Sequence, residues 1–187
     1  IELPYLNTSA RTQPKVAVFS ITYDRLSYTK RSFETLGRTA GYPYTHFVID
    51  NGSTDGTKEW ITEEWIEKNW DNYFLFTQNT GISKASNTAI EMIKKKGDFD
   101  IIVKWDNDCF GLTPGWLKTM VKVWQSNHIF ALSCYVQGLV DNPGGSPRIG
   151  YGTVKGELIG VTQHLGGICH FVDIHAYDKF RWDEHSF

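Results

Sequence analysis

Two aspartates with one residue between them carry the clearest chemistry in this chain. Asp106-Asn107-Asp108 directly follows the apolar run 101–105, which predicts a buried strand. Hard divalent cations prefer oxygen ligands, and they commonly keep open positions for phosphate groups. The carboxyl ends of parallel strands are also where α/β proteins bind ligands. The tripeptide therefore indicates a divalent metal ion and a phosphorylated ligand at one end of a sheet.

The same aspartates have three other interpretations. A solvated loop is the simplest of them. An EF-hand loop starting at Asp106 would have Asp108 and Gly111 in place, but Phe110 and Leu117 stand where ligands are required. A dehalogenase-type phosphatase would carry its aspartate pair after the first strand, whereas this pair follows about the fourth predicted strand. The nucleotide and metal reading fits the strand context best.

The composition limits the number of domains and the kinds of partner that the chain can have. The chain has 187 residues, 41% of them hydrophobic and 21% charged, which predicts one globular domain with a sizeable core. A net charge of −2 predicts no broad attraction to nucleic acid or to an anionic membrane. No apolar run reaches 18 residues, so no transmembrane segment is expected. The start lacks Met and a signal peptide, which indicates a processed or excised piece.

The three cysteines, Cys109, Cys134 and Cys169, show no C-x-x-C spacing. An odd number of such residues is typical of reduced, mostly buried thiols. We therefore expect a cytoplasmic location.

Strands and helices are expected to alternate along the chain after an irregular arm at 1–14. Short apolar runs predict strands at 16–21, 47–49, 73–76, 101–105, 129–136 and 166–172, with a hairpin within 149–161. Helices are expected from Leu26 to near Gly37, from a cap at Ser53 or Asp55 to about residue 68, from a cap at Ser83 to 96, and from 113–114 onward. This order predicts an α/β fold, a Rossmann-like three-layer α/β/α sandwich with a mostly parallel central sheet.

Trp60, Trp65 and Trp70 are spaced by five residues. That spacing does not follow one face of an α-helix. We therefore expect the three rings to pack in separate places.

Polar clusters follow four of the predicted strands. In a parallel sheet these strand ends lie along one edge, so the clusters can converge. Glycines among them allow close backbone approach, and carboxylates can bind ribose or metal. The clusters lie at 22–25, 50–55, 79–81 and 106–108.

Together these segments resemble the inverting nucleotide-sugar glycosyltransferases of family 2, which have the GT-A fold. The most specific piece is Phe47-Val48-Ile49-Asp50-Asn51-Gly52-Ser53-Thr54-Asp55-Gly56-Thr57, which resembles that family's Val-Asp-Asp-Gly-Ser-x-Asp-Gly-Thr segment. The other matching segments are 16–25, 79–87, 106–108 and 113–117. The resemblance implies one domain over 1–187, with a nucleotide-sugar binding half at 15–125. Residues 126–187 would be a partial acceptor-side half, truncated at its C-terminus.

The resemblance also implies roles for residues after the first two strands. Asp50 would accept a hydrogen bond from the nucleobase, and Tyr23 would pack on that base. Thr22 and Asp24 would line the same pocket. Ordinary turn formation is the alternative for Thr22, Asp24 and Asp50, because these residue types suit turns.

Further implied roles concern the sugar, the phosphates and the metal. Gly81 would permit close approach of the donor, and Asn87 would orient the Asp-x-Asp loop or simply bond helix backbone. Asp106 would contact ribose or metal, and Asp108 would be the firmer metal ligand. The cofactor would be Mn²⁺ or Mg²⁺, bridging the diphosphate of the donor.

The sequence departs from the family pattern in places. Asp24 replaces the usual Asn, and Asn51 replaces the second Asp of an Asp-Asp pair. Ser86 stands where Arg is frequent, and Lys84 is a nearby candidate to replace that positive charge. A solvated helix surface is the alternative for Lys84.

The catalytic base is the main gap. An inverting transferase needs a carboxylate to take the proton of the acceptor hydroxyl. The segments at 166–167 and 181–187 resemble those that precede this carboxylate in the family, so the base is expected beyond Phe187 or is absent. Asp183 and Glu184 are weak substitutes. His170 or His175 could supply a third metal ligand, with a structural histidine as the alternative.

Three functions follow as hypotheses. The first is a metal-dependent inverting glycosyltransferase that moves a sugar from a nucleoside-diphosphate donor, UDP-linked by resemblance, to a hydroxyl of a saccharide, lipid or protein. The second is a nucleotide-sugar binding domain that lacks the base and does not turn over. The third is a sugar nucleotidyltransferase, which the absence of Gly from 20–25 disfavours, since that class carries a Gly-rich loop after its first strand.

Overall fold

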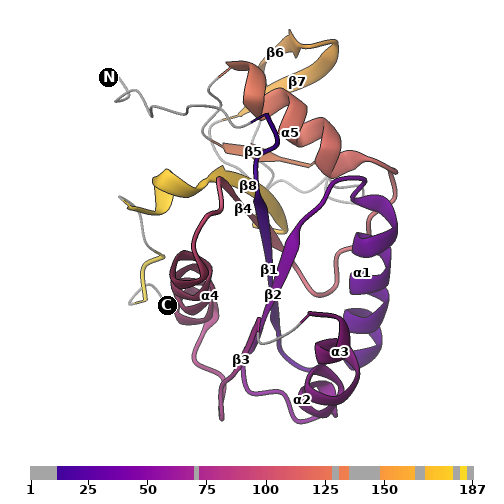
Figure 1. Ribbon diagram of the computed structural model, residues 1–187, viewed down its shortest axis with the longest axis vertical. Coiled ribbons are helices and arrows are strands. Elements are labelled where there is room, and N and C mark those ends of the chain that lie inside the picture. The colour runs from indigo at the N-terminus through magenta and orange to yellow at the C-terminus, as the bar shows by residue number, and fades with distance from the viewer. Residues whose placement is uncertain are drawn as a thin grey trace.

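The computed structural model describes residues 12–69, 72–127, 131–134, 148–162, 167–178 and 182–184. Its central feature is a six-stranded sheet in the order β3-β2-β1-β4-β8-β5 (Figure 1). The strands β1, β2, β3 and β4 pair in parallel, whereas β8 runs antiparallel to both β4 and β5. Their bounds are Val16–Thr22 for β1, Thr45–Asp50 for β2, Tyr73–Leu75 for β3, Ile101–Trp105 for β4, Ala131–Ser133 for β5 and Cys169–Asp173 for β8.

A separate two-stranded hairpin consists of β6 (Arg148–Val154) and β7 (Glu157–Thr162), as the pattern around 149–161 predicts. The helices cover both faces of the large sheet. They are α1 (Leu26–Thr39), α2 (Thr57–Trp60), the π-helix η1 (Ile61–Trp65), α3 (Ile66–Asn69), α4 (Ile82–Lys96), α5 (Trp116–Asn127) and the 3₁₀ helix η2 (Ile174–Asp178).

Alternation along the strands explains the layers. Successive side chains of a strand point to opposite faces, and both faces here are apolar. Val18 and Val103 pack with Leu117 in the core under α1 and α5, whereas Phe19 and Ile102 pack under α4. Figure 1 shows α4 on one side of the sheet and α1 on the other. The expected three-layer α/β/α sandwich with a mostly parallel sheet is therefore confirmed.

The expectation for the tryptophan spacing is wrong for the first two rings. Trp60 and Trp65 both lie near Phe33, with ring centroids 5.9 and 6.4 Å from its ring. The reason is the π-helix at 61–65, whose wider turn brings residues five apart closer to one face. Trp70 lies outside the described residues.

Glycine sets the starts of α4 and α5, for which a cap at Ser83 and a start at 113–114 were expected. The helix α4 begins at Ile82 after Gly81, one residue before the expected cap Ser83, and α5 begins at Trp116 after Gly115. Both glycines have positive φ, at 85° and 78°. Because this backbone turn suits a residue without a Cβ, the glycine determines where the helix begins.

Asp55 takes a different role from that of a simple cap. The helix α2 begins at Thr57, and the backbone N–H of Thr57 donates to Asp55 Oδ1 at 3.1 Å. The other oxygen of Asp55 accepts the N–H of Leu26 at 2.8 Å, at the start of α1. One carboxylate thus serves the first turns of two helices, where negative charge also suits the helix dipoles.

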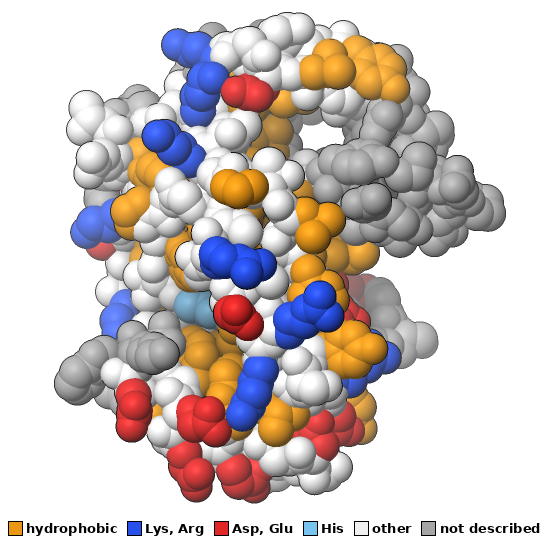
Figure 2. Space-filling view, turned by 90° about the vertical axis from the view of Figure 1, so that its right-hand side faces the viewer, with side chains coloured by type: hydrophobic (Ala, Val, Ile, Leu, Met, Phe, Trp, Pro, Cys, Tyr) orange, Lys and Arg blue, Asp and Glu red, His pale blue; other side chains and the backbone are white. Residues whose placement is uncertain are grey.

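The surface over α1 is basic, and the surface over α2, η1 and α3 is acidic. Figure 2 shows Lys and Arg side chains along the middle of this face and Asp and Glu gathered below them. Lys30 of α1 joins the two regions, with its Nζ 3.3 Å from Glu64 Oε1 and 5.5 Å from the ring centroid of Trp60. No helix within the described ranges is both long and apolar enough to cross a bilayer. The three cysteines are free thiols, Cys169 buried and the others half-buried.

Gly52 holds the turn after β2 against the segment that follows β3. Its φ is +92°, and a Cβ at this position would lie 2.4 Å from the backbone carbon of Gln78. We expect Gly52→Ala to lower the free energy of unfolding by about 3 kcal/mol or more, because left-handed backbone strain and a backbone clash add. Urea denaturation followed by tryptophan fluorescence measures this change.

Gly152→Ala is the matched control for that substitution. A Cβ at Gly152 meets nothing within 4 Å, and its φ lies outside the left-handed region. We expect an effect within about 0.5 kcal/mol. Equal stabilities for the two variants would contradict the close packing of the β2 turn.

His46 is a buried imidazole in β2, 6% exposed, whose Nε2 lies 3.0 Å from Ser20 Oγ. Its ring packs edge-on against Phe33 and Trp65. Burial lowers the pKa of His46 to about 3, because the surrounding core disfavours the imidazolium. The folded chain therefore excludes a proton that the unfolded chain binds below about pH 6.5.

This proton exclusion has a definite sign. Below about pH 6.5, His46 lowers the free energy of unfolding by up to about 1.4 kcal/mol for each pH unit. Above that pH it has no such effect. When the pH falls from 7 to 5, we expect the free energy of unfolding to decrease by about 2 kcal/mol less in His46→Phe than in the parent chain. Urea denaturation at both pH values gives the two differences. Parallel losses in parent and variant would show that His46 does not carry the effect.

Candidate functional site

Asp50 is a buried carboxylate at the end of β2 with four hydrogen-bond donors around it. Its Oδ1 accepts the backbone N–H groups of Gly52 (3.1 Å) and Ser53 (2.9 Å). Its Oδ2 accepts the hydroxyls of Thr22 (2.8 Å) and Ser53 (2.5 Å). Asp50 and Thr22 have no exposed surface, and they are partners in the parallel pairing of β1 and β2. The carboxylate therefore fixes the ends of both strands.

The loops after β1 and β2 are bonded to each other above Asp50. Ser53 Oγ accepts the backbone N–H of Asp24 at 2.8 Å, and Asp24 Oδ1 accepts the N–H of Thr54 at 2.7 Å. Asp24 and Arg25 both have positive φ, at 53° and 61°. This uncommon backbone turns the chain sharply into α1, and the bonds to 53–54 hold it there.

The Asp-x-Asp loop is fixed from two sides. The N–H of Asp106 donates to Ile168 O at 3.0 Å, next to β8. From α1, Ser32 Oγ donates to Asp106 O at 3.2 Å, and Thr29 Oγ1 accepts from Asn107 Nδ2 at 3.0 Å. The loop is thus a defined turn held between α1 and β8, which disfavours the simple solvated loop.

Each carboxylate of the Asp-x-Asp pair has its own cationic partner. Lys104 Nζ contacts Asp106 Oδ1, and Arg25 Nη1 lies 2.8 Å from Asp108 Oδ2. Burial raises the pKa of the Asp106 carboxyl above its ordinary value, while Lys104 acts in the opposite direction and Asp108 adds to the increase. The pair of Arg25 and Asp108 is more exposed, so it contributes little stability and opens readily.

A cavity of about 620 Å³ lies at the carboxyl ends of β1, β2 and β4, where these clusters meet. Its walls combine backbone, amide, aromatic and charged groups. The lining residues are Ile21, Tyr23, Asn51, Asn79, Gly81, Ile82, Lys104, Asp106, Asn107, Asp108, Gly167, Ile168 and Trp182.

Four of the residues expected in a donor site line this cavity: Tyr23, Gly81, Asp106 and Asp108. Tyr23 is 49% exposed, so its ring has a face available to a ligand. Gly81 stands at the start of α4, whose positive dipole end suits an anion.

Asp50 and Thr22 are not among the lining residues, because both are buried beneath the cavity. The neighbouring Asn51 lines it instead, and its amide also bonds Asn79 and Thr80. Asp50 thus supports the site from below, and Asn51, itself buried, forms part of the cavity wall. All four donors to Asp50 come from the protein, and its direct contact with a nucleobase stays a prediction.

Asn87 holds a different segment from the one expected. Its Nδ2 donates to Trp182 O (3.0 Å) and to Glu184 Oε1 (2.7 Å), and its Oδ1 accepts the N–H of Trp182 (3.1 Å). It therefore positions residues 182–184 beside the cavity and makes none of these bonds to the Asp-x-Asp loop. Lys84 is exposed on α4, and Asp24 lies at the edge of the site; neither lines the cavity.

The weak candidates for base and third metal ligand also lie off the cavity wall. Asp183 and Glu184 are exposed, and Glu184 is bonded by Asn87. His170 is buried in β8 with Tyr177 Oη 3.4 Å from its Nε2, and burial lowers its pKa to about 4. His175 is exposed on η2. Neither histidine is among the lining residues, so a structural role suits both.

Sequence reasoning missed Lys104, Asn51, Trp182 and the pairing of Arg25. A signal existed for Lys104, because a lysine inside the otherwise apolar run 101–105 is unusual for a buried strand. Trp182 carried no such signal, since only the folded chain brings it to the cavity.

A divalent metal ion fits the chemistry of Asp106 and Asp108. Both offer hard carboxylate oxygens to one cavity, and Asp108 is held only by a half-exposed arginine. Within the part of the chain that the structure describes, no group of three or more His, Cys, Asp or Glu side chains is arranged to hold a metal ion. Of the described residues, Asp106 and Asp108 are the two that would offer carboxylates to a metal ion from the cavity wall.

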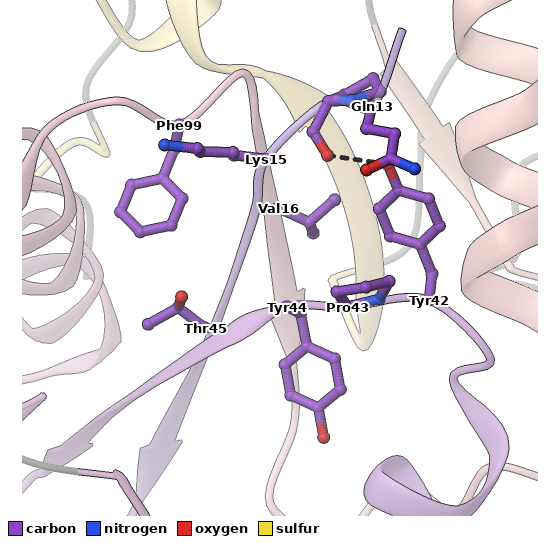
Figure 3. A pocket seen from close by; sticks show the side chains of 9 residues that line it. Gln13, Lys15, Val16, Tyr42, Pro43, Tyr44, Thr45 and Phe99 are labelled. Atoms are coloured by element: carbon purple, nitrogen blue, oxygen red, sulfur yellow. Dashed lines mark hydrogen bonds between the residues drawn. The ribbon is translucent and has the colours of Figure 1, made fainter.

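A second hollow of about 330 Å³ lies at the opposite ends of β1 and β2 (Figure 3). The labelled side chains around it include Tyr42, Tyr44 and Phe99, and Tyr42 Oη donates to Pro14 O at 2.8 Å. Its only charged lining residue is Lys15. With no carboxylate in its wall, this hollow lacks the chemistry that the first cavity has.

Residues 17–172 match the family model described as glycosyl transferase family 2. The chain belongs to glycosyl transferase family 2. No curated protein sequence matches it.

Solved structures show the same fold. S. aureus TarS 1–349 has a TM-score of 0.65 at 19% identity over 91% of this chain and 51% of that one. TarS 1–349 in complex with UDP-GlcNAc has a TM-score of 0.55 at 24% identity over 72% and 37%. The mannosyltransferase PcManGT from Pyrobaculum calidifontis, in complex with GDP-Man and Mn²⁺, has a TM-score of 0.52 at 24% identity over 66% and 36%. The GT-A expectation is confirmed, and the chain spans about half or less of these relatives.

Asn87→Ala tests whether this side chain holds the 182–184 segment. The substitution removes three hydrogen bonds, so we expect amide exchange at Trp182 to become at least about tenfold faster. Hydrogen exchange with mass spectrometry of the peptide covering 182–184 measures it. Thr88→Ala on the same helix is the control, because Thr88 bonds only Lys84 O in its own helix. Unchanged exchange in Asn87→Ala would refute the assignment.

Proposed function

We propose that this family 2 chain builds the donor site of a metal-dependent inverting glycosyltransferase. The reaction moves a sugar from a nucleoside-diphosphate sugar, UDP-linked, to an acceptor hydroxyl of a saccharide, lipid or protein. The observation that carries the proposal is the cavity at the carboxyl ends of β1, β2 and β4, with Asp106 and Asp108 both in its wall. Similar folds in complex with UDP-GlcNAc and with GDP-Man and Mn²⁺ support it.

The nucleoside part of the donor fits the side of the cavity near β1 and β2. The half-exposed ring of Tyr23 offers a face for stacking a base. Asn51 lines the same side of the cavity, and its bonds to Asn79 and Thr80 fix the wall beside that ring. Asp50, Thr22 and the loop bonds beneath keep these two side chains in place.

The diphosphate fits between α4 and the Asp-x-Asp loop. Gly81 and Ile82 place the N-terminus of a 15-residue helix at the cavity, where its dipole favours negative charge. Asp106 and Asp108 would hold Mn²⁺ or Mg²⁺, with Asp108 released from Arg25 and Asp106 also within reach of ribose. When bound, such an ion supplies positive charge that stabilises the departing diphosphate.

The acceptor side is the less complete part. Inversion requires a carboxylate near the acceptor hydroxyl. In the described part of the chain, the carboxylates lining the cavity are those of Asp106 and Asp108, and Glu184 is held by Asn87. This observation favours, as the second candidate, a domain that binds nucleotide sugars without turnover. Product formation by the 187-residue chain alone would exclude that second candidate.

Calorimetric titration with UDP, GDP and dTDP, each with Mn²⁺ and with EDTA, tests the donor site. We expect one nucleotide to bind at least about tenfold more tightly with Mn²⁺, and Asp108→Ala to remove that gain, because the ion loses its main ligand. Asp98→Asn is the control, since Asp98 pairs with Lys15 away from the cavity. A folded chain that binds none of the three nucleotides would refute the proposed function.

A further inference from the structure

Lys104 is a buried ammonium on a strand whose other four residues are apolar. The residue is 4% exposed, and it lies on the sheet face that carries Phe19 and Ile102. Removing an ammonium from water is unfavourable unless polar partners surround it, so an apolar residue would be the easier choice for this position. Its presence therefore calls for a specific role.

The contacts of Lys104 leave part of its donor capacity for a ligand. An ammonium has three N–H donors. In the described structure Nζ contacts two acceptors, Asp106 Oδ1 and Gly167 O, the latter at 2.7 Å. All three residues line the 620 Å³ cavity, so the ammonium lies at its wall and not in a closed core.

The charges around the cavity also favour a role for Lys104 in binding a ligand. Among the described residues, those that line the cavity and carry charge are Lys104, Asp106 and Asp108. A diphosphate would meet two carboxylates there, which repel it, and the cation of Lys104, while the exposed Arg25 pairs with Asp108 from outside the lining. Because Lys104 pairs with Asp106, the net charge on that side is close to zero before any metal ion binds. Its positive charge is also felt by His170 across the strand pair, whose pKa burial lowers first and Lys104 lowers further.

We propose that Lys104 binds the diphosphate of the donor directly and supplies part of the positive charge at this site, besides the divalent ion. The inference rests on the proposed donor site and assigns a residue within it. It has two consequences. The chain keeps a measurable affinity for nucleoside diphosphates when metal is removed, and this affinity depends on Lys104.

The simpler alternative is that Lys104 only neutralises Asp106. In that case an uncharged pair at 104 and 106 would bind nucleotides as well as the parent chain does. A diphosphate contact differs, because its loss must weaken binding of the diphosphate and leave the nucleoside unaffected. Comparing a nucleoside with its diphosphate therefore separates the two roles.

The experiment is calorimetric titration of the 187-residue chain with UDP and uridine in EDTA, and with GDP and guanosine as a second pair. Lys104→Met removes the charge at similar volume, and Lys104→Arg keeps it. We expect Lys104→Met to weaken diphosphate binding about 10- to 100-fold while nucleoside binding stays the same, and Lys104→Arg to restore most of the loss. Lys15→Met is the control, since Lys15 pairs with Asp98 away from the cavity.

Each other outcome overturns the proposal. Equal losses for nucleoside and diphosphate, or no loss for either, would show that Lys104 does not contact the diphosphate. If Lys104→Met does not fold, Lys104→Met with Asp106→Asn removes both charges together, and diphosphate binding equal to the parent would refute the contact. A parent chain that binds UDP or GDP with Mn²⁺ but neither of them in EDTA would refute the Lys104 contact and leave the donor site standing. A parent chain that binds no nucleotide even with Mn²⁺ would refute the donor site itself, and the role of Lys104 with it.

Discussion

A carboxyl group buried at the end of β2 holds the β1 and β2 side of the cavity together. Asp50 has no exposed surface, and a polar group in such a place must have its oxygens satisfied by the protein. Thr22, Gly52 and Ser53 do so, which joins β1 to the turn after β2. Through Ser53 the same network reaches Asp24, and so the start of α1. Asp50 thereby links the end of β1, the turn after β2 and the start of α1.

The other side of the cavity is organised by paired charges. Lys104 and Arg25 hold the two aspartates after β4, one pair in the protein interior and one near the surface. The two pairs differ in what they allow. A buried pair resists being broken, since either partner left alone would be an isolated charge, whereas a half-exposed pair exchanges with solvent ions at little cost. The site thus combines one fixed and one exchangeable ion pair.

The sequence was sufficient for the parallel strands, the layers and the convergence of polar strand ends, because each follows from local periodicity and the geometry of parallel sheets. It was not sufficient to say which of Asp50 and Asn51 faces the cavity, since a shift of one residue reverses a side chain's direction. Trp60 and Trp65 both pack on Phe33 because of a π-helix, and no pattern in the sequence predicted that helix. Residues 167–168 and 182 reach the site only through long-range pairing.

The sheet order has a consequence for how the chain folds. The strand β5 pairs only with β8 among the described strands, and β8 lies between β4 and β5 although it follows both in sequence. During synthesis, β4 therefore remains an open edge until residues some 65 positions later arrive. Open edges of this kind recruit other chains, and such distant pairings form slowly. The part of the cavity wall beside β8 would close only after that pairing, and a nascent chain would be more vulnerable to aggregation before it.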